Sequence, residues 1–335
     1  MGAVTPAVLA VDGGNSKTDV LLVADDGTVL ATARGPGASP QHVGVRGCLD
    51  AVAALAREAA ARAGRPGEPP FARHTAACLA GADLPLDERE LRAAVAARGW
   101  SGTAAVDNDT FALLRAGTDD GVGVAVVCGA GINCVGVAAD GRVSRFPALG
   151  RISGDWGGGA FLGREVLWWA VRAEDGRGAP TALLPAVVDH FGVRRAAEVV
   201  EALHFGELPA DAVHELCPLL FEVAASGDPV SRALCDRLAE EVGLLATVTL
   251  RRLDMLDTPG VVVLGGGVLT GGGRSLLPAV RARCAALAPR ARIRLVEAPP
   301  VLGAALLGLD RIGAGPRAGQ RLREGVDPRA DARPS

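Results

Sequence analysis

The sequence has very few aromatic side chains, which make up 3% of its residues, and it contains no tyrosine. Stacking surfaces for single-stranded nucleic acid are therefore not expected. Lysine occurs once, arginine is scattered among acidic residues, and the net charge is -3, so no basic stripe is available to bind nucleic acid. The chain also lacks a long apolar run and a basic N-terminal segment followed by an apolar one. We expect a cytoplasmic protein with neither nucleic acid nor membrane as partner.

The cysteines form no Cys-x-x-Cys pair and no Cys/His cluster at metal-binding spacing. They are Cys48, Cys78, Cys128, Cys134, Cys217, Cys235 and Cys284. We interpret them as small buried residues in a reducing compartment. The spacing of His204 and His214 fits no standard zinc pattern, so these two side chains are assigned to packing or to the surface.

Length and composition favour two domains of ordinary size. The chain has 335 residues, 49% of them hydrophobic, and 45 glycines. One hydrophobic core seldom serves a chain of this length. The many glycines indicate places where backbone comes close to backbone or to a ligand.

An internal repeat gives the organisation. Residues 7–35 read as strand, glycine loop, strand, Asp-Asp-Gly turn and strand, and residues 122–146 repeat this plan. A weaker echo relates residues 74–83 to residues 260–269, each an apolar run that leads into glycine. Alanine-rich helices are predicted between these strands, at 48–63, 86–97 and 228–253. Both halves should therefore contain mixed α/β layers.

The predicted domains follow from this repeat. We expect an N-terminal domain of residues 1–117 that is completed by residues 299–312, because the apolar helix 301–312 should pack back on the first half. Residues 118–298 should form the second domain. Residues 313–335 are rich in Gly, Pro and Arg without apolar periodicity, and we predict a mobile tail there.

The first loops of the two repeated units are candidates for binding a polyphosphate. The residues concerned are Asp12, Gly13, Gly14, Asn15, Ser16, Lys17 and Thr18 in the first unit, and Gly129, Ala130, Gly131, Ile132 and Asn133 in the second. Glycine lets backbone N–H groups approach phosphate oxygens, and a carboxylate at a strand end can hold Mg²⁺ through water. Two tight hairpins of a duplicated fold would give the same pattern, and Lys17 could bind phosphate or project into solvent. If the halves are related by a pseudo-two-fold axis, the loops would face one another across one cleft.

Three further segments carry candidate ligand contacts. Gly265, Gly266 and Gly267 follow an apolar strand and could let backbone pack against a nucleotide base, or they could form a flexible connection. Asp109 precedes the predicted helix 110–116, where an acidic residue is either an N-cap or a base beside an acceptor hydroxyl. Asp155, in a glycine-rich segment, is either a ligand contact or a turn residue.

These pieces together resemble the N-acetylglucosamine kinase branch of the BadF/BadG/BcrA/BcrD-type ATPase family, in the superfamily of sugar kinases, heat-shock chaperones and actin. The resemblance covers about residues 7–312. Its motifs are AVDGGNSKTDV, VDNDTFALLRAG, CGAGINC, SGDWGGGAFLG, SGDP at 226–229 and VVVLGGGVL. It implies two duplicated actin-like, ribonuclease H-like α/β domains, each with a mixed sheet flanked by helices, with a cleft between them.

The resemblance also implies an activity and site roles. The activity is transfer of phosphate from ATP, with Mg²⁺, to a primary hydroxyl, O6, of an amino sugar such as N-acetylglucosamine or glucosamine. Asp109 would be the catalytic base and Asp12 would position Mg²⁺ through water. The adenosine loop would contain Gly265, Gly266, Gly267 and Thr270. The sugar would contact Ser39, Gln41, Asn108, Asp109, Asn133, Asp155 and Trp156. Relatives usually form homodimers.

One departure leaves the identity of the sugar open, and three rival interpretations are disfavoured. Relatives carry Gly-Asp-Glu-Gly where this chain has Trp156, and an indole could stack on a sugar ring or fill the space of an acyl group. A dehydratase-activating ATPase of the same family would need thiolates for an iron-sulfur cluster. A zinc-containing ROK sugar kinase would need a Cys-rich knuckle, which the chain lacks. A sensor of nucleotide and sugar would not need Asp109.

Overall fold

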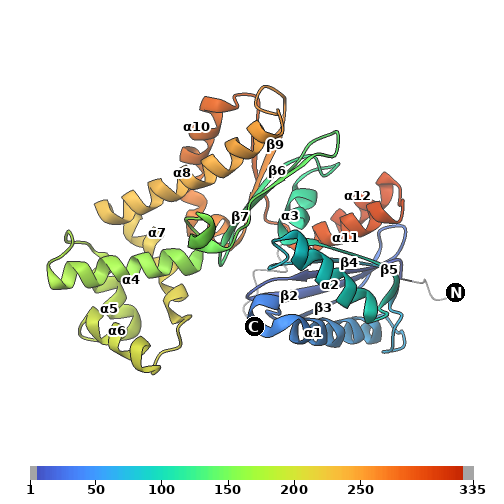
Figure 1. The fold of residues 1–335 in the computed structure, drawn as a ribbon, viewed down its shortest axis with the longest axis horizontal. Coiled ribbons are helices and arrows are strands. Elements are labelled where there is room, and N and C mark those ends of the chain that lie inside the picture. Colours follow the sequence, from blue (N-terminus) through green and yellow to red (C-terminus); the bar gives the residue numbers. More distant parts are fainter. Residues whose placement is uncertain (1–5, 327–335) are drawn as a thin grey trace. The chain divides into compact units, whose positions relative to one another are not determined.

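The computed structural model describes residues 6–326, and within them the chain divides into two units (Figure 1). Unit 1 consists of Met1–Gly123 and Val296–Ser335, and unit 2 of Val124–Leu295. These boundaries lie a few residues from the ones predicted from the repeat.

Unit 1 contains one five-stranded mixed sheet with strand order β3-β2-β1-β4-β5. Its strands are β1 (Val8–Gly13), β2 (Lys17–Val23), β3 (Val29–Pro36), β4 (Ala72–Leu79) and β5 (Ser101–Asn108). Its helices are α1 (Pro40–Arg62), α2 (Pro85–Ala97), α3 (Asp109–Gly117), α11 (Pro300–Arg311) and α12 (Pro316–Gly325). β1 pairs antiparallel with β2 and parallel with β4, and β4 pairs parallel with β5. The carboxyl ends of β1, β4 and β5 therefore meet at one edge.

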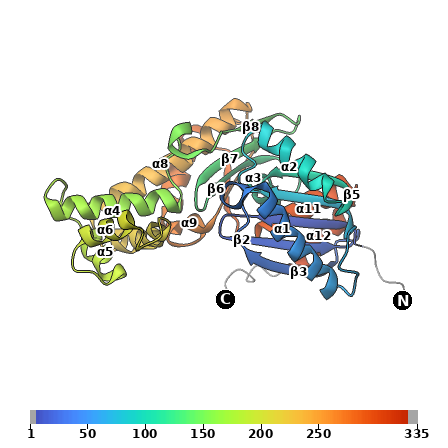
Figure 2. The ribbon, with the colours of Figure 1, turned by 60° about the horizontal axis from the view of Figure 1, so that its bottom comes forward.

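Alternating side chains of this sheet form two aliphatic cores. Leu9 and Val11 of β1 pack with α1 and α2 on one face. Val8 and Ala10 pack with α3, α11 and α12 on the other face. Figures 1 and 2 show these helices on the two sides of the sheet. Helix α11 covers most of the predicted helix 301–312, and its buried residues belong to the second of these cores.

Unit 2 repeats the topology of unit 1, with strand order β10-β9-β6-β7-β8. Its strands are β6 (Gly123–Cys128), β7 (Ile132–Val137), β8 (Val143–Arg145), β9 (Val261–Gly265) and β10 (Arg292–Leu295). Its α-helices are α4 (Gly159–Asp175), α5 (Leu183–Phe191), α6 (Ala196–Phe205), α7 (Cys217–Ala225), α8 (Pro229–Arg252), α9 (Gly267–Thr270) and α10 (Leu277–Leu287). Short 3₁₀ turns lie at η1 (Gly150–Ser153), η2 (Ala212–Leu216) and η3 (Gly272–Leu276).

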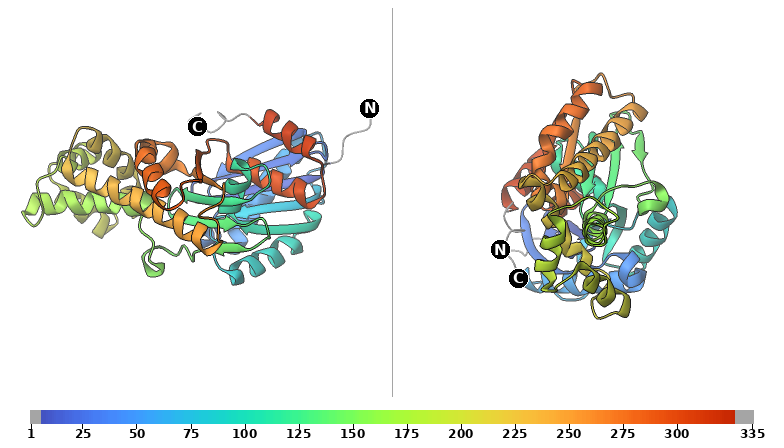
Figure 3. Two further views of the ribbon diagram at one scale, coloured as in Figure 1. Left: turned by 90° about the horizontal axis from the view of Figure 1, so that it is seen from above. Right: turned by 90° about the vertical axis from the view of Figure 1, so that its left-hand side faces the viewer.

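The two sheets correspond strand by strand, which confirms the duplication. β1, β2 and β3 match β6, β7 and β8, and the parallel neighbours β4 and β5 match β9 and β10. The weak echo between residues 74–83 and 260–269 is the correspondence of β4 with β9. Unit 2 differs in its added helices: Figures 1 and 3 show α4 to α7 gathered at one end of this unit, beyond the sheet. The predicted α/β fold is thus observed in both halves.

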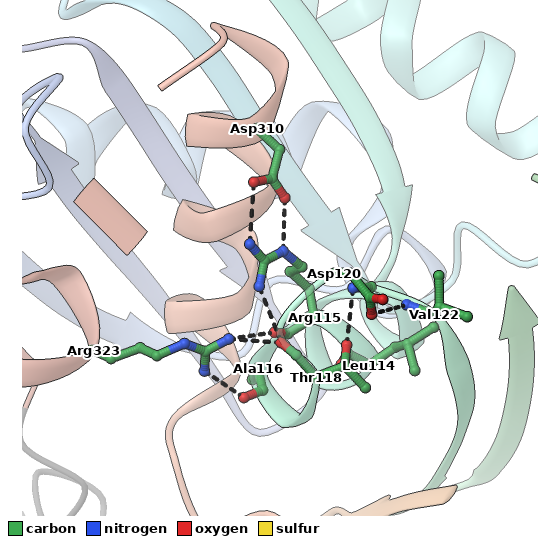
Figure 4. A network of polar contacts seen from close by, with 9 residues as sticks. Leu114, Arg115, Ala116, Thr118, Asp120, Val122, Asp310 and Arg323 are labelled. Carbon is green, nitrogen blue, oxygen red and sulfur yellow. Dashed lines mark hydrogen bonds and ion pairs between the residues drawn. The ribbon is translucent and has the colours of Figure 1, made fainter. Parts of the chain in front are cut away.

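The prediction of a mobile tail is wrong for residues 316–325, which form α12. Arg323 donates to the backbone oxygens of Ala116 at 2.7 Å, Arg115 at 3.1 Å and Thr118 at 2.7 Å. The Arg115 guanidinium in turn pairs with Asp310 of α11 at 2.7 and 3.1 Å (Figure 4). Composition concealed this helix because its apolar contribution is small, with Ala318 and Leu322 buried. Residues 327–335 of the predicted tail lie outside the described residues.

Candidate active site

Acidic side chains gather at the carboxyl edge of the parallel strands in unit 1. Asp12 of β1 is in register with Cys78 of β4, and Cys78 is in register with Asp107 of β5. In-register residues of neighbouring strands point to the same face of a sheet. Burial first, and then the negative charges of Asp107, Asp12 and Asp109, raise the pKa of the Cys78 thiol well above its usual value. Three carboxylates therefore surround one buried thiol at this edge.

The first glycine loop, residues 13–18, is a tight connection between β1 and β2. The N–H of Gly14 donates to the oxygen of Lys17 at 2.9 Å, and the N–H of Ala38 donates to the oxygen of Gly14 at 3.2 Å. Gly37 is in close contact with this loop, because a Cβ there would lie 1.9 Å from the backbone oxygen of Asn15. The segment that follows β3 thus fixes the backbone of the loop from the side.

Some polar side chains of this loop are buried without a hydrogen-bond partner, and others are exposed or partly exposed. The side-chain oxygens Oδ1 of Asn15 and Oγ1 of Thr18 are buried and have no hydrogen-bond partner. Such atoms are uncommon in folded proteins and require an explanation. Ser16 is exposed. The ammonium of Lys17 lies 3.9 Å from a carboxylate oxygen of Asp19, and its side chain is 37% exposed, so it neither projects freely into solvent nor is fully engaged.

Asp109 is the first residue of α3, and it does not cap the helix. The cap is Asn108, whose Oδ1 accepts hydrogen bonds from the backbone N–H of Thr110 at 3.0 Å and from its hydroxyl at 2.6 Å. The alternative that Asp109 is a plain N-cap is therefore removed. The Asp109 side chain is partly exposed. Burial raises its pKa to about 6, although backbone N–H groups of the helix start oppose the shift. A carboxyl with this pKa is suited to accept a proton near neutral pH.

Asp83, which belongs to none of the motifs found in the sequence, links residues of unit 1 that were predicted to contact the sugar. Its carboxylate accepts from Nε2 of Gln41 at 3.0 Å and from Nδ2 of Asn108 at 2.9 Å. Ser39 is fully buried, caps α1 through Gln41 N–H and approaches the oxygen of Ala80 at 3.5 Å. The predicted sugar-side residues Ser39, Gln41, Asn108 and Asp109 thus lie in one connected group. The signal for Asp83 was its place just after the β4 strand end, in the stretch Leu-Ala-Gly-Ala-Asp.

Asp83 also has an unusual pKa. Burial first, and then the charges of Asp109 and Asp87, raise it to about 7, while hydrogen bonds from Gln41 and Asn108 oppose the shift. Asp109, with a pKa of about 6, therefore ionises first and its charge disfavours ionisation of Asp83. Two neighbouring carboxyls with separated pKa values are typical of active sites, although ion-pair networks also produce them.

The second glycine loop, in unit 2, contacts the start of α4. The N–H of Gly129 donates to the oxygen of Gly131 at 2.9 Å, and the N–H groups of Gly159 and Ala160 donate to the oxygens of Gly129 and Ala130 at 2.7 and 3.0 Å. The following Asn133 accepts from the N–H of Cys134 at 2.7 Å. The glycine-rich stretch before α4 permits this contact, since a Cβ on Gly158, which has φ +87°, would lie 2.5 Å from the Cα of Gly131.

The third glycine run connects β9 to α9. Gly265 ends the strand and Gly267 begins the helix, and Gly267 is exposed. The hydroxyl of Thr270 donates to the oxygen of Gly266 at 3.1 Å. β9 lies beside β6, so this run and the second glycine loop lie at the ends of neighbouring parallel strands. Its role in binding adenosine stays a prediction.

Asp155 and Trp156 have protein partners within unit 2. A carboxylate oxygen of Asp155 accepts from the N–H of Gly150 at 2.9 Å and from the hydroxyl of Ser153 at 2.7 Å, so it closes a turn. The Trp156 ring lies 5.0 Å from that of Phe161, and the Arg237 guanidinium lies over it at 4.9 Å. The sugar contacts predicted for Asp155 and Trp156 stay predictions. So does the prediction that the two phosphate loops face one another.

The residues at the acidic edge suit Mg²⁺. Among the described residues, no three or more His, Cys, Asp or Glu side chains are arranged to hold a metal ion. Mg²⁺ in kinase sites usually keeps several waters and takes only one or two carboxylates together with substrate phosphates. Asp12, which is 5% exposed and in the same row as Asp107, provides hard oxygen donors of this kind.

The duplicated sheets and their glycine loops define the actin-like class of ATPases, and comparisons with known proteins identify the family. The model of the BadF/BadG/BcrA/BcrD ATPase family matches residues 9–308, so the chain belongs to that family. An N-acetyl-D-glucosamine kinase of Dictyostelium discoideum is 26% identical over 216 residues, which are 63% of this chain and 67% of that protein.

Solved structures agree with this placement. A candidate N-acetylglucosamine kinase from Chromobacterium violaceum is 26% identical, with a TM-score of 0.71 over 91% of this chain and 99% of that one. A candidate N-acetylglucosamine kinase from Porphyromonas gingivalis is 20% identical, with a TM-score of 0.63 over 90% and 98%. A ROK hexokinase from Thermus thermophilus is 22% identical, with a TM-score of 0.54 over 92% and 99%. The last two comparisons concern the fold alone.

No helix in residues 6–326 combines the length and the apolar character that crossing a bilayer requires.

Proposed function

We propose that this chain is an ATP-dependent kinase that transfers the γ-phosphoryl group of ATP to a primary hydroxyl, O6, of an amino sugar such as N-acetylglucosamine or glucosamine. Family membership and the kinase relatives support the class of reaction. The observation that carries the proposal is the partly exposed Asp109 carboxyl, with a pKa of about 6, at the same sheet edge as Asp12. A sensor or a structural protein has no need for such a base.

In the proposed reaction, Asp109 orients the sugar hydroxyl and accepts its proton. The hydroxyl oxygen forms a bond to the γ-phosphorus, the bond from that phosphorus to the β,γ-bridging oxygen breaks, and ADP leaves with the bond electrons. Because the transition state is loose, positioning and charge neutralisation supply most of the rate. Mg²⁺, held by Asp12 through water, would neutralise phosphate charge when bound.

The glycine loops would hold the nucleotide. The N–H groups of Gly14 and Gly129 close their own loops, and the other backbone N–H groups at the tips of these loops would bind phosphate oxygens. The buried, unpartnered hydroxyl of Thr18 can donate to a phosphate oxygen, whereas Oδ1 of Asn15 accepts only and suits a donor or a cation. Residues 265–267 and Thr270 would contact adenosine. A homodimer and a cytoplasmic location are proposed with this function.

The dehydratase-activator alternative is disfavoured by the cysteines. All seven are free and buried. Burial raises the pKa of Cys128 and of Cys134 to about 12, which opposes the thiolate form that an iron-sulfur cluster needs.

The test is an ADP-release assay with ATP, Mg²⁺ and a panel of sugars that includes N-acetylglucosamine, glucosamine and glucose. We expect rapid ADP release with an amino sugar. Asp109→Asn should lower kcat at least about a hundredfold. The matched control is Asp119→Asn, which removes an exposed carboxylate of the same unit and should leave kcat unchanged. Nucleotide binding without ADP release in the presence of any sugar would instead identify a sensor.

A further inference from the structure

Asp83 joins three parts of unit 1 that the proposed function uses. It lies in the connection after β4 and is 9% exposed. One of its oxygens accepts from the amide of Gln41 on α1 at 3.0 Å, and the other accepts from the amide of Asn108, the cap of α3, at 2.9 Å. Asp109 follows Asn108 directly. A single carboxylate thus connects the start of α1 to the residue before the proposed base.

The chemistry of these contacts fixes how both amides are turned. An ionised carboxylate has acceptors only, so each amide must present its nitrogen to Asp83. The carbonyl oxygen of Asn108 is then used by the N–H and hydroxyl of Thr110. Gln41 differs, since its side chain is exposed and its Oε1 accepts no hydrogen bond from any residue that the structure describes. Its carbonyl oxygen is therefore left available for a ligand.

We propose that Asp83 is a positioning residue that turns Gln41 so that Oε1 faces the acceptor sugar, where it selects a sugar with a hydrogen-bond donor at that position, such as the N–H of a 2-amino or 2-acylamino group. This inference rests on the proposed kinase function and on Gln41 lying beside the sugar. Asp83 does not touch the reacting atoms. Its effect on substrate choice passes through the orientation of one exposed amide.

The first test exchanges the acceptor for an amide, in Asp83→Asn. An amide has one acceptor oxygen, and Asn108 keeps it, because turning Asn108 would break the cap of α3. The introduced NH₂ then faces Gln41, which turns round and presents its own NH₂ to the sugar. We expect the KM for the amino sugar to rise about tenfold, because one hydrogen bond to the sugar is lost and a donor of Gln41 then faces a donor of the sugar. The KM for ATP should change less than about twofold.

The decisive variant exchanges donor and acceptor between the two positions, in Asp83→Asn combined with Gln41→Glu. The introduced amide donates to the introduced carboxylate, whose second oxygen again faces the sugar as an acceptor. We expect the KM for the sugar to return to within about threefold of the wild-type value. Gln41→Glu alone should raise the KM for the sugar more than Asp83→Asn or the double exchange does, because it places two carboxylates side by side. Glu90→Gln is the matched control: it removes an exposed carboxylate of α2 that bonds neither amide, and it should leave the KM for the sugar unchanged.

The pH dependence of the KM for the sugar distinguishes a positioning role of Asp83 from a purely structural one. The pKa of Asp83 is about 7, and Asp109 of α3 and Asp87 of α2 are the charged groups that raise it. Below this pH the protonated carboxyl carries a donor and no longer fixes the amide of Gln41. The wild-type KM for the sugar should therefore rise as the pH falls from 8 to 6, and this dependence should be absent in Asp83→Asn.

Three results would overturn the inference. One is an unchanged KM for the sugar in Asp83→Asn, and another is a double exchange no better than the single one. If Asp83→Asn fails to fold, Gln41→Ala decides, because its exposed side chain can be removed without unfolding; a wild-type KM for the sugar in that variant is the third. Failure of the kinase proposal is recognised separately, since the wild-type protein would then release no ADP with any sugar, and the inference would fall with it.

Discussion

The strongest quantitative prediction concerns the pH dependence of the proposed base. The partial burial of Asp109 raises its pKa to about 6, against 3.8 for an ordinary aspartate. A base must be ionised, so about 90% of the enzyme is competent at pH 7 and about 10% at pH 5. An aspartate of ordinary pKa would still be more than about 90% ionised at pH 5. We therefore expect kcat to fall about tenfold between pH 7 and pH 5.

The assay should measure ADP directly, by chromatography of quenched samples, since coupling enzymes have pH dependences of their own. Saturating sugar separates this effect from that of Asp83, which acts on the KM for the sugar. Asp109→Asn should lose at least about a hundredfold in kcat, keep its affinity for ATP, and show no inflection near pH 6. A wild-type kcat that is constant from pH 5 to pH 7, or comparable turnover in Asp109→Asn, would refute the assignment of the base.

Three further predictions concern stability and the first glycine loop. Gly37→Ala should raise the KM for ATP at least about tenfold, because its Cβ would lie 1.9 Å from a backbone oxygen of that loop, whereas Gly67→Ala, in open space, should not. Arg323→Ala should lower the free energy of unfolding by about 2–4 kcal/mol in urea titrations, with Arg317→Ala as the exposed control; equal midpoints for both would contradict the role of α12. The raised pKa of Asp83 means that the native state holds this proton more tightly than the unfolded chain, so this group's stabilisation is lost as the pH rises from about 4 to about 7. Asp83→Asn should therefore gain stability relative to the wild-type protein over that window, and a constant difference between pH 4.5 and pH 7.5 would disprove the shift.

Much of the fold could be predicted because the repeat is local. Each glycine hairpin lies within about thirty consecutive residues, and its alternation of strand and turn is visible in the sequence. The repeat indicated that the two halves share one plan, whereas the order of the strands came from the structure. Helix α12 could not be predicted, since Arg323 is held by backbone oxygens of residues some two hundred positions away. Composition does not report such contacts.

Residues of the candidate site could be predicted where the residue type itself implies chemistry. They could be predicted less well where strand pairing decides which residues come together. Asp12 and Asp109 were identified from their places at strand ends. Asp107 belongs to the same edge only because β4 and β5 pair in a particular register. In the sequence Asp83 resembles any turn residue, and only the structure shows its two amide partners, Gln41 and Asn108. Whether Asp109 or Asn108 caps α3 also required side-chain geometry.

The most direct test of the account is to identify the product. Purified protein is incubated with ATP, Mg²⁺ and N-acetylglucosamine or glucosamine, and the sugar is examined by phosphorus and proton NMR. We expect a sugar monophosphate whose phosphorus couples to the two protons on C6, formed in step with ADP. Release of inorganic phosphate with unmodified sugar, or no nucleotide turnover at all, would contradict it.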